Sequence, residues 1–335
     1  MAAEERDTPL RLLSWPGMPA REALAAASER IGVPIEVDDT IVDNGVLEAR
    51  LAAGERFDLI CPSDYLVAKL AADGALLPLD DGLLPGRAGL AAWARDPAYD
   101  PGDRSSVPLA FGTVGFLYDR DALGGDPRSW SALLDPPAGA RVGMLAEHRE
   151  VVAAALLAAG RGANDADPDA LAAARELLLA QTPSVARYDS DDFVSPVVAR
   201  EVAAHQAWSG PASVAVRADA RLGYVVPDEG AVAWVTTVAI SAACDRPRLA
   251  HAAIEALLDP ALARITVERN GYATPNAAAR ALLAPELRDD PVLFPDEATI
   301  ARCTTLEALD AAAEERVERL WRELVHAHVT PSSHP

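Results

Sequence analysis

Residues 57–74 read FDLICPSDYLVAKLAADG, and this stretch decides the fold class. FDLICPS is a short apolar run of the kind that forms a buried strand. DYLVAKLAADG follows with a helical pattern, and Gly74 just past its end is a common helix terminator. A strand followed at once by a helix is the repeating element of a helix-covered parallel sheet. The stretch therefore predicts an α/β protein.

The residues on the N-terminal side of this stretch follow the same alternation. LRLLSW (10–15) and PIEV (34–37) are strand-like runs, and each precedes a helical pattern, PAREALAAASERIG (19–32) or NGVLEARLAAG (44–54). The first helix has a proline near its start and Gly32 just past its end. Proline is common at the start of helices and glycine just after their end. We therefore expect a parallel sheet covered by helices.

The alternation starts again in the second half of the chain. VPLAFGTVGFLYD (107–119) is an extended run that is long for one strand, and RVGML (141–145) and HREVVAAALLAAG (148–160) then restore the strand–helix order. Because 335 residues exceed what one compact core usually fills, we expect two α/β lobes. The absence of a solvated linker predicts lobes that are joined by ordinary strands and hinge about a cleft.

We place the lobe boundaries within long apolar runs rather than in a linker. Each expected lobe contains two separate parts of the chain. They are 1–113 plus 237–281 for the first lobe and 114–236 plus 282–335 for the second.

Charge and cysteine content argue against several classes of protein. The chain carries 51 acidic and 30 basic side chains, a formal charge of −21, which disfavours nucleic-acid and anionic membrane partners and favours cationic ligands. Cys61, Cys244 and Cys303 show no CxxC spacing, so neither a metal cluster nor a disulfide framework is indicated. Cys61, inside an apolar run, is expected to be buried.

Several motifs, in the order in which they occur, resemble the spermidine/putrescine-binding proteins, the solute-binding components of polyamine ABC importers. The resemblance covers nearly the whole chain. The motifs that carry it are LRLLSWPG (10–17), GERFDLICPSDYLVAKLAADGALLPLD (54–80), SWSALLDP (129–136), AEHREVV (146–152), AWSG (207–210), EGAVAW (229–234), NGYATPNAAARALLAPEL (270–287) and LFPDEATI (293–300). The resemblance implies a two-lobed periplasmic binding protein type II fold with a ligand cleft between the lobes and no catalysis.

The resemblance also implies an amine site. Glu147 and Glu150 fall where the family places acidic groups that meet a polyamine's nitrogens, and a carboxylate beside a helix N-terminus is kept ionised by the N–H groups there. Without the resemblance, the two glutamates would be interpreted as stabilising the helix N-terminus through a favourable interaction with the helix dipole. Aromatic rings can cover the alkyl part of such a ligand. The residues matching the family's aromatic positions are Trp15, Tyr65, Trp208, Trp234 and Tyr272.

Three further positions bear on the ligand. Ser63 lies between a strand and a helix, where its hydroxyl either caps the helix or binds a ligand nitrogen, capping being the commoner role. Thr236 stands where the family has an aspartate that binds a terminal ammonium, so one carboxylate is missing. Either an acid from the run DSDD (189–192) compensates and a polyamine binds, or the ligand has one cationic end and a neutral or apolar remainder.

Apolar residues also replace polar or aromatic positions of the family at Pro16, Met18 and Leu306. Trp130 and Trp321 have no counterpart in the family's ligand box, and we interpret both as core residues.

The resemblance implies the capture of a polyamine, or a related organic amine, for a membrane permease. No cofactor, metal site or enzyme activity is expected, because no GxSxG, HExxH or P-loop motif is present. A cytoplasmic amine sensor is the alternative, and a hydrolase is the least favoured class. We expect a monomer that is periplasmic or lipid-anchored if an export signal was removed, and cytoplasmic if Met1 is the true start.

Overall fold

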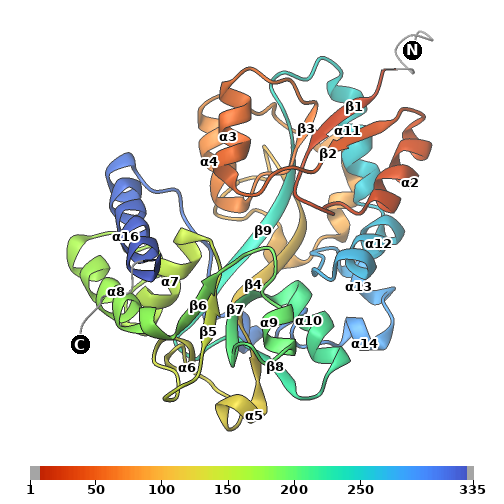
Figure 1. The fold of residues 1–335 in the computed structure, drawn as a ribbon. Coiled ribbons are helices and arrows are strands. Elements are labelled where there is room, and N and C mark those ends of the chain that lie inside the picture. The colour runs from red at the N-terminus through yellow and green to blue at the C-terminus, as the bar shows by residue number, and fades with distance from the viewer. Residues whose placement is uncertain (1–7, 330–335) are drawn as a thin grey trace. The chain divides into compact units, whose positions relative to one another are not determined.

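The computed structural model describes residues 8–329, which divide into two compact units (Figure 1). Unit 1 comprises the chain up to Phe111 and the segment Trp234–Asp290, and unit 2 comprises Gly112–Ala233 and the chain from Pro291. The chain passes from one unit to the other inside β4 (Val107–Asp119), inside β9 (Ala231–Ile240) and after Asp290. The extended run predicted at 107–119 is confirmed as a single strand.

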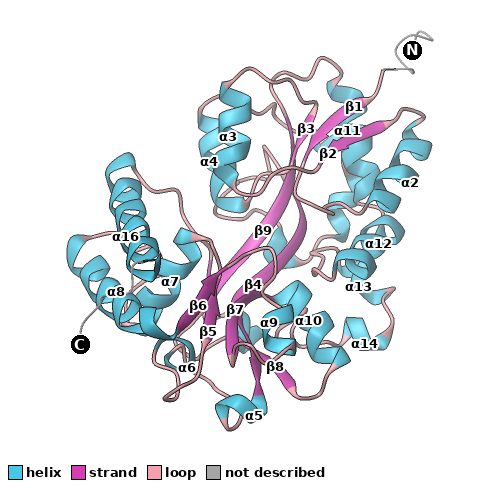
Figure 2. Ribbon diagram, in the orientation of Figure 1, coloured by secondary structure: helices cyan, strands magenta, loops and turns pink. Residues whose placement is uncertain are grey.

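Unit 1 contains the sheet order β2-β1-β3-β9, shown in magenta in Figure 2. β1 pairs in parallel with β2 and with β3, and β3 pairs antiparallel with the last two residues of β9. The strands are β1 (Leu10–Leu13), β2 (Ile35–Asp38) and β3 (Leu59–Ile60), and the α-helices are α2 (Arg21–Ile31), α3 (Asn44–Ala52), α4 (Asp64–Ala72), α11 (Pro247–Leu257), α12 (Pro260–Asn270), α13 (Ala277–Ala281) and α14 (Pro285–Arg288). Three 3₁₀ turns lie between α4 and β4, at Asp81–Leu83, Pro85–Gly89 and Ala92–Ala94.

Alternation along the strands produces two apolar cores in unit 1, because successive side chains of a strand point to opposite faces. Leu12 and Leu59 belong to a core shared with α2, α11 and α12. Leu13 and Ile60 belong to a second core shared with α3 and α4. Cys61 is fully buried, as its apolar context predicts. The sheet is therefore covered on both faces, which explains why the residues of β1 and β3 are apolar except for the exposed Arg11.

Unit 2 repeats the α/β pattern with the sheet order β4-β7-β5-β6. β8 pairs with β4, and β10 pairs with the first residues of β9. The strands are β5 (Val142–Met144), β6 (Val185–Tyr188), β7 (Ala204–Trp208), β8 (Leu222–Val225) and β10 (Cys303–Thr304), and the α-helices are α5 (Arg120–Leu123), α6 (Ser131–Leu134), α7 (His148–Ala158), α8 (Pro168–Gln181), α9 (Ser195–Val198), α10 (Ser209–Ala218), α15 (Glu297–Ile300) and α16 (Ala311–Val329). Trp130 is buried and donates to the carbonyl of Gly230 at 2.8 Å, which confirms that it is a core residue.

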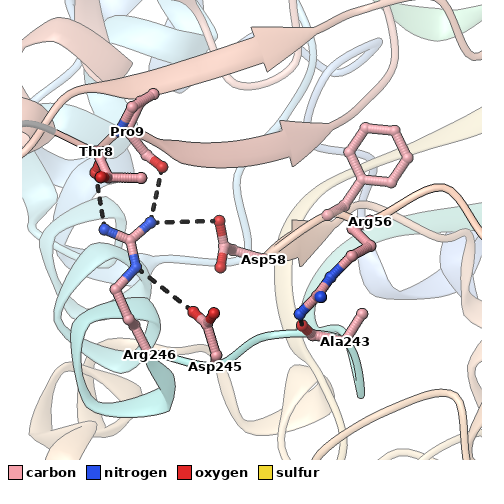
Figure 3. A pocket seen from close by; sticks show the side chains of 8 residues that line it. Thr8, Pro9, Arg56, Asp58, Ala243, Asp245 and Arg246 are labelled. Atoms are coloured by element: carbon pink, nitrogen blue, oxygen red, sulfur yellow. Dashed lines mark hydrogen bonds and ion pairs between the residues drawn. The ribbon is translucent and has the colours of Figure 1, made fainter. Parts of the chain in front are cut away.

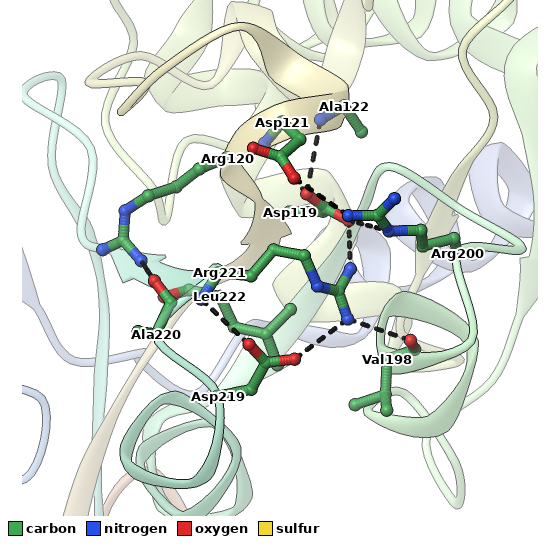
Figure 4. Close-up of polar contacts among 10 residues, drawn as sticks. All are labelled: Asp119, Arg120, Asp121, Ala122, Val198, Arg200, Asp219, Ala220, Arg221 and Leu222. Atoms are coloured by element: carbon green, nitrogen blue, oxygen red, sulfur yellow. Dashed lines mark hydrogen bonds and ion pairs between the residues drawn. The ribbon is translucent and has the colours of Figure 1, made fainter.

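A buried carboxylate fixes the end of β4 in unit 2 (Figure 4). The side chain of Asp119 accepts hydrogen bonds from the main-chain N–H groups of Asp121 and Ala122, which begin α5, and it pairs with Arg221 and Arg200. Burial is the largest influence on this carboxyl and raises its pKa, but the Arg221 and main-chain hydrogen bonds outweigh it, so the pKa lies below its usual value. The cluster joins β4, α5, β8 and the segment after α9.

The observed divisions of the chain, at 111/112, 233/234 and 290/291, differ from the expected boundaries at 113/114, 236/237 and 281/282. Residues from Trp234 lie in unit 1, because the Trp234 ring packs on Tyr272 and the N–H of Val235 donates to Asp64. The chain as far as Asp290 also lies in unit 1, because the guanidinium of Arg280 donates twice to the carbonyl of Arg288. The contacts of Trp234 and Val235 join residues far apart in sequence, and a linear pattern does not reveal them.

Candidate functional site

The two predicted glutamates of unit 2 lie on the first turn of α7. Glu147 occupies the N-cap position, and its carbonyl accepts from the N–H of Val151 at 2.9 Å, but its side chain makes no capping hydrogen bond. Glu150 lies three residues later, still in the first turn of the helix. A helix N-terminus favours negative charge, so both side chains are placed where an ionised carboxylate is stable. Capping therefore does not explain Glu147.

Glu150 is held by Trp208, the last residue of β7. The indole N–H donates to the Glu150 carboxylate at 2.9 Å, and the Trp208 ring packs edge-on against Phe193. The amide of Gln206 donates to the main-chain carbonyl of Glu150 at 3.1 Å and so fixes the helix turn that carries it. All of these side chains belong to unit 2. The structure therefore unites two predicted site residues and adds Phe193, which the sequence did not single out.

Ser63 and Tyr65 of unit 1 share one hydrogen-bonding partner, Asn44. The Asn44 amide donates to the Ser63 hydroxyl at 3.0 Å and to the Tyr65 hydroxyl at 2.8 Å, and it accepts from the Ser63 N–H at 3.2 Å. Ser63 precedes α4 but makes no side-chain capping bond, so the interpretation of its hydroxyl as a helix cap is wrong. Instead, the Ser63 hydroxyl accepts from the amide of Asn44 on α3, and no pattern of neighbouring residues in the sequence predicts this contact.

The remaining predicted residues of unit 1 surround the same segment. The main chain of Thr236 pairs with that of Ser63, and its side chain is buried. Trp234 packs edge-on against Tyr272, with ring centroids 5.0 Å apart. Trp15 donates from its indole to the carbonyl of Cys61 at 2.8 Å, two residues before Ser63. These contacts place Thr236 and Trp15 beside the segment that carries Ser63 and pair Trp234 with Tyr272, all within unit 1.

Asp64 is a charged residue that the sequence analysis missed. It is 1 % exposed and accepts from the N–H of Tyr65 at 2.9 Å and from the N–H of Val235 at 3.2 Å. Burial raises the pKa of this carboxyl to about 7, although the main-chain hydrogen bonds lower it. Its position between Ser63 and Tyr65 was the available signal, but an aspartate in the first turn of a helix is usually an exposed residue near the helix dipole.

The acidic run 189–192 forms local turns. The Asp189 carboxylate accepts from the N–H groups of Asp191 and Asp192, and the Asp192 carboxylate accepts from the N–H of Ser195 at the start of α9. The run therefore forms a loop that leads into the start of α9. Met18 and Leu306 are both buried, as their apolar character favours.

Two surface hollows lie in unit 1 away from the nine predicted residues. One, of about 550 Å³, is lined by Thr8, Pro9, Arg56, Phe57, Asp58, Ala243, Asp245 and Arg246 (Figure 3). Its cationic groups are already engaged, because Arg246 donates to the Thr8 and Pro9 carbonyls at 2.7 Å and Arg56 donates to Ala243. The other, of about 920 Å³, has Glu255 bonded to the N–H of Gly86. These bonds tie neighbouring segments of unit 1 together.

Within residues 8–329, no helix combines the length and the apolar character that crossing a membrane requires. The same part of the chain contains no group of three or more side chains placed to hold a metal ion.

Comparison with known proteins identifies the family. Residues 24–295 match the model of the bacterial extracellular solute-binding proteins. The putrescine/cadaverine-binding protein of Pseudomonas aeruginosa is 31% identical over 330 residues, covering 94% of this chain and 93% of that protein. The spermidine/putrescine-binding periplasmic protein of Salmonella typhimurium is 32% identical over 305 residues, covering 90% and 86%.

A solved structure agrees with these sequence relationships. The putative spermidine/putrescine ABC transporter structure from Listeria monocytogenes superposes with a TM-score of 0.87 at 27% identity, covering 95% of this chain and 98% of that one. The predicted α/β fold of the periplasmic binding protein type II class is thereby confirmed, as is the resemblance to the spermidine/putrescine-binding proteins. The chain belongs to the bacterial extracellular solute-binding protein family.

Proposed function

We propose that this protein is the solute-binding component of an ABC importer and that it binds a polyamine or a closely related organic amine. The observation that carries the proposal is the hydrogen bond from the Trp208 indole to the Glu150 carboxylate at a helix N-terminus. Such a carboxylate is fixed in direction, and the helix N-terminus favours its negative charge, which is what an ammonium group removed from water requires. The names of the relatives from Pseudomonas aeruginosa and Salmonella typhimurium support the same ligand class.

The nine predicted residues have distinct roles in this proposal. Glu147 and Glu150 supply the negative charge. The rings cover the methylene chain, and their faces favour a nearby cation. Ser63 and Thr236 supply hydroxyl oxygens. The aromatic residues of the proposed site are Trp15, Tyr65, Trp208, Trp234 and Tyr272.

The partner in this proposal is the membrane permease of the importer, which receives the loaded protein. The name of the Salmonella typhimurium relative, a periplasmic protein, supports an exported location. The protein acts as a monomer and performs no chemistry on its ligand. Net charge of −21 also favours the approach of cationic ligands at low ionic strength.

A ligand screen tests the proposal. Thermal melts would be recorded with putrescine, cadaverine, spermidine, n-butylamine, amino acids and simple cationic metabolites, because a ligand that binds the folded state raises apparent stability. We expect the largest shift with a polyamine. A screen in which no amine raises the melting temperature, while another class of solute does, would overturn the proposal.

Titration calorimetry of Glu150→Gln then tests the carboxylate itself. We expect affinity for the selected amine to fall by about 1.5–3 kcal/mol, roughly 10- to 150-fold, the scale of a hydrogen bond to a charged group. Glu176→Gln is the matched control, because Glu176 is an exposed glutamate on α8 in the same unit. An unchanged affinity in Glu150→Gln would remove this residue from the site.

A further inference from the structure

The unit 1 part of the proposed site contains a carboxylate to which no role is assigned, Asp64. It is the first residue of α4 and is 1 % exposed. Its sequence neighbours, Ser63 and Tyr65, are both residues of the proposed site and are both only half-buried. Aspartate is rarely buried to this degree without a cationic partner or a function that requires its charge.

The contacts of Asp64 place it between the two segments that form this part of the site. One carboxylate oxygen accepts from the N–H of Tyr65, and the other accepts from the N–H of Val235, which lies between Trp234 and Thr236. Both donors are neutral. Among residues 8–329, no ion pair includes Asp64.

The groups packed around Asp64 leave its negative charge without compensation. Its own helix contributes the main-chain N–H of Tyr65, and β9 contributes the main-chain N–H of Val235, which lies between the uncharged residues Trp234 and Thr236. The segment before β4 contributes Tyr99, whose pKa is raised first by burial and then by the charge of Asp64 itself. A cationic ligand group would supply the charge that these described neighbours lack.

We propose that Asp64 supplies the negative charge that pairs with the second cationic group of a diamine. The neighbouring Thr236 carries no charge and cannot fill this role. This inference rests on the proposed function and concerns the specificity of the same site. The main-chain pairing of Ser63 with Thr236 brings α4 and β9 together, so a carboxylate at 64 acts on the same region as one at 236 would. A buried carboxylate is more costly to ionise than an exposed one, and binding of a dication offsets that cost.

Proton release is the measurable consequence. Burial raises the pKa of Asp64 to about 7, so the free protein carries a proton there in much of the population at neutral pH. When a dication binds the ionised form of Asp64, the protein releases this proton to the buffer. Diamine affinity should therefore rise with pH until Asp64 is ionised in the free protein.

The experiment is titration calorimetry of the full chain with putrescine and with n-butylamine at pH 6 and pH 8, each in two buffers of different ionisation enthalpy. Both amines stay protonated over this range. For putrescine we expect about 0.9 proton released per ligand at pH 6 and about 0.1 at pH 8, with affinity about tenfold higher at pH 8. For n-butylamine we expect little release and little change.

Asp64→Asn and Asp73→Asn provide the matched comparison, because Asp73 is an exposed aspartate at the end of the same helix. Asp64→Asn should lose the difference in proton release between pH 6 and pH 8, and it should lose more than tenfold in putrescine affinity at pH 8 while binding n-butylamine as before. Asp73→Asn should behave as the parent. If Asp64→Asn does not fold, the two-buffer measurement on the parent protein still decides the question.

The outcomes separate this inference from the proposed function. Absence of binding by any amine to the parent protein would overturn the proposed function. Putrescine binding with equal proton release at pH 6 and pH 8, or an Asp64→Asn variant that keeps the parent's pH dependence, would overturn the role of Asp64 and leave the amine-binding function standing.

Discussion

The indole N–H of Trp208 donates a 2.9 Å hydrogen bond to the carboxylate of Glu150. Trp208 ends a strand of unit 2 and Glu150 lies in the first turn of a helix, so the bond joins the two elements that present these side chains. It limits the directions that the carboxylate can take. Fewer orientations remain to be lost when a ligand binds, and this preorganisation favours affinity.

Trp208→Phe separates the hydrogen bond from the ring. The substitution keeps an aromatic side chain against Phe193 but removes the indole donor. We expect amine affinity to fall by about 1 kcal/mol, roughly fivefold, which is less than the loss in Glu150→Gln because the charge remains. Calorimetry of both variants and of the double variant gives their coupling energy. Strictly additive losses would show that the bond does not position the carboxylate for binding.

Thr236→Asp restores a carboxylate at the position where the resembled family has one. We expect higher affinity for putrescine or spermidine at pH 8 and lower stability of the free protein, because a second carboxylate would be added beside Asp64 at a position only 6 % exposed. Calorimetry measures the first effect and thermal melting the second. Loss of affinity, or no change, would show that this position does not set specificity.

Asp119→Ala tests the cluster at the end of β4. Removal of this carboxylate leaves Arg221 without its buried partner and α5 without its capping acceptor, so we expect the free energy of unfolding to fall by about 3–5 kcal/mol. Urea denaturation measures the loss. Asp121→Ala is the control, since that side chain is 72% exposed, and its effect should stay within about 0.5 kcal/mol.

We expect the buried His205 to make the stability of the folded protein depend on pH. Burial is the main cause that lowers the pKa of His205 to about 4, below its usual value of 6.5. Between pH 6.5 and pH 4, His205 therefore binds a proton in the unfolded chain but not in the folded protein. Stability from this group is present above pH 6.5 and is lost as the pH falls through 4, by about 2 kcal/mol at pH 5.

Urea titrations at pH 7.5 and pH 5 on the parent and on His205→Gln measure that contribution as the difference between the two proteins. His326→Gln serves as the comparison, because His326 is exposed on α16. An equal loss of stability in the parent and in His205→Gln would contradict the assignment to His205.

The local elements were predictable because their signals are local. The helix expected at 19–32 ends at Gly32, which adopts the left-handed conformation that glycine tolerates best. The strand expected at 57–63 is shorter, since the continuous strand contains only Leu59 and Ile60, Ser63 forms an isolated bridge, and Pro62 lacks an N–H for a sheet ladder. The prediction of an α/β fold is still correct, because the buried run still leads into a helix.

The contacts of the candidate site were not predictable from sequence. Asn44 binds Ser63 across nineteen positions, and Val235 binds Asp64 across 171. The fold decides which side chains meet, so a list of residues that match a family's motifs says which groups are present and not how each is held. Asp64 illustrates the point, because its burial and not its type distinguishes it from an ordinary helix-start acid.

The chain enters each unit twice, and this has a consequence for truncation. β3 pairs with Ala239 and Ile240, and α2 packs with α11, so the first 111 residues expressed alone would lack a strand partner and a covering helix. No uninterrupted stretch of the gene encodes either half. A stop codon or frameshift near the middle of the gene should therefore yield an insoluble fragment and no independently folded domain.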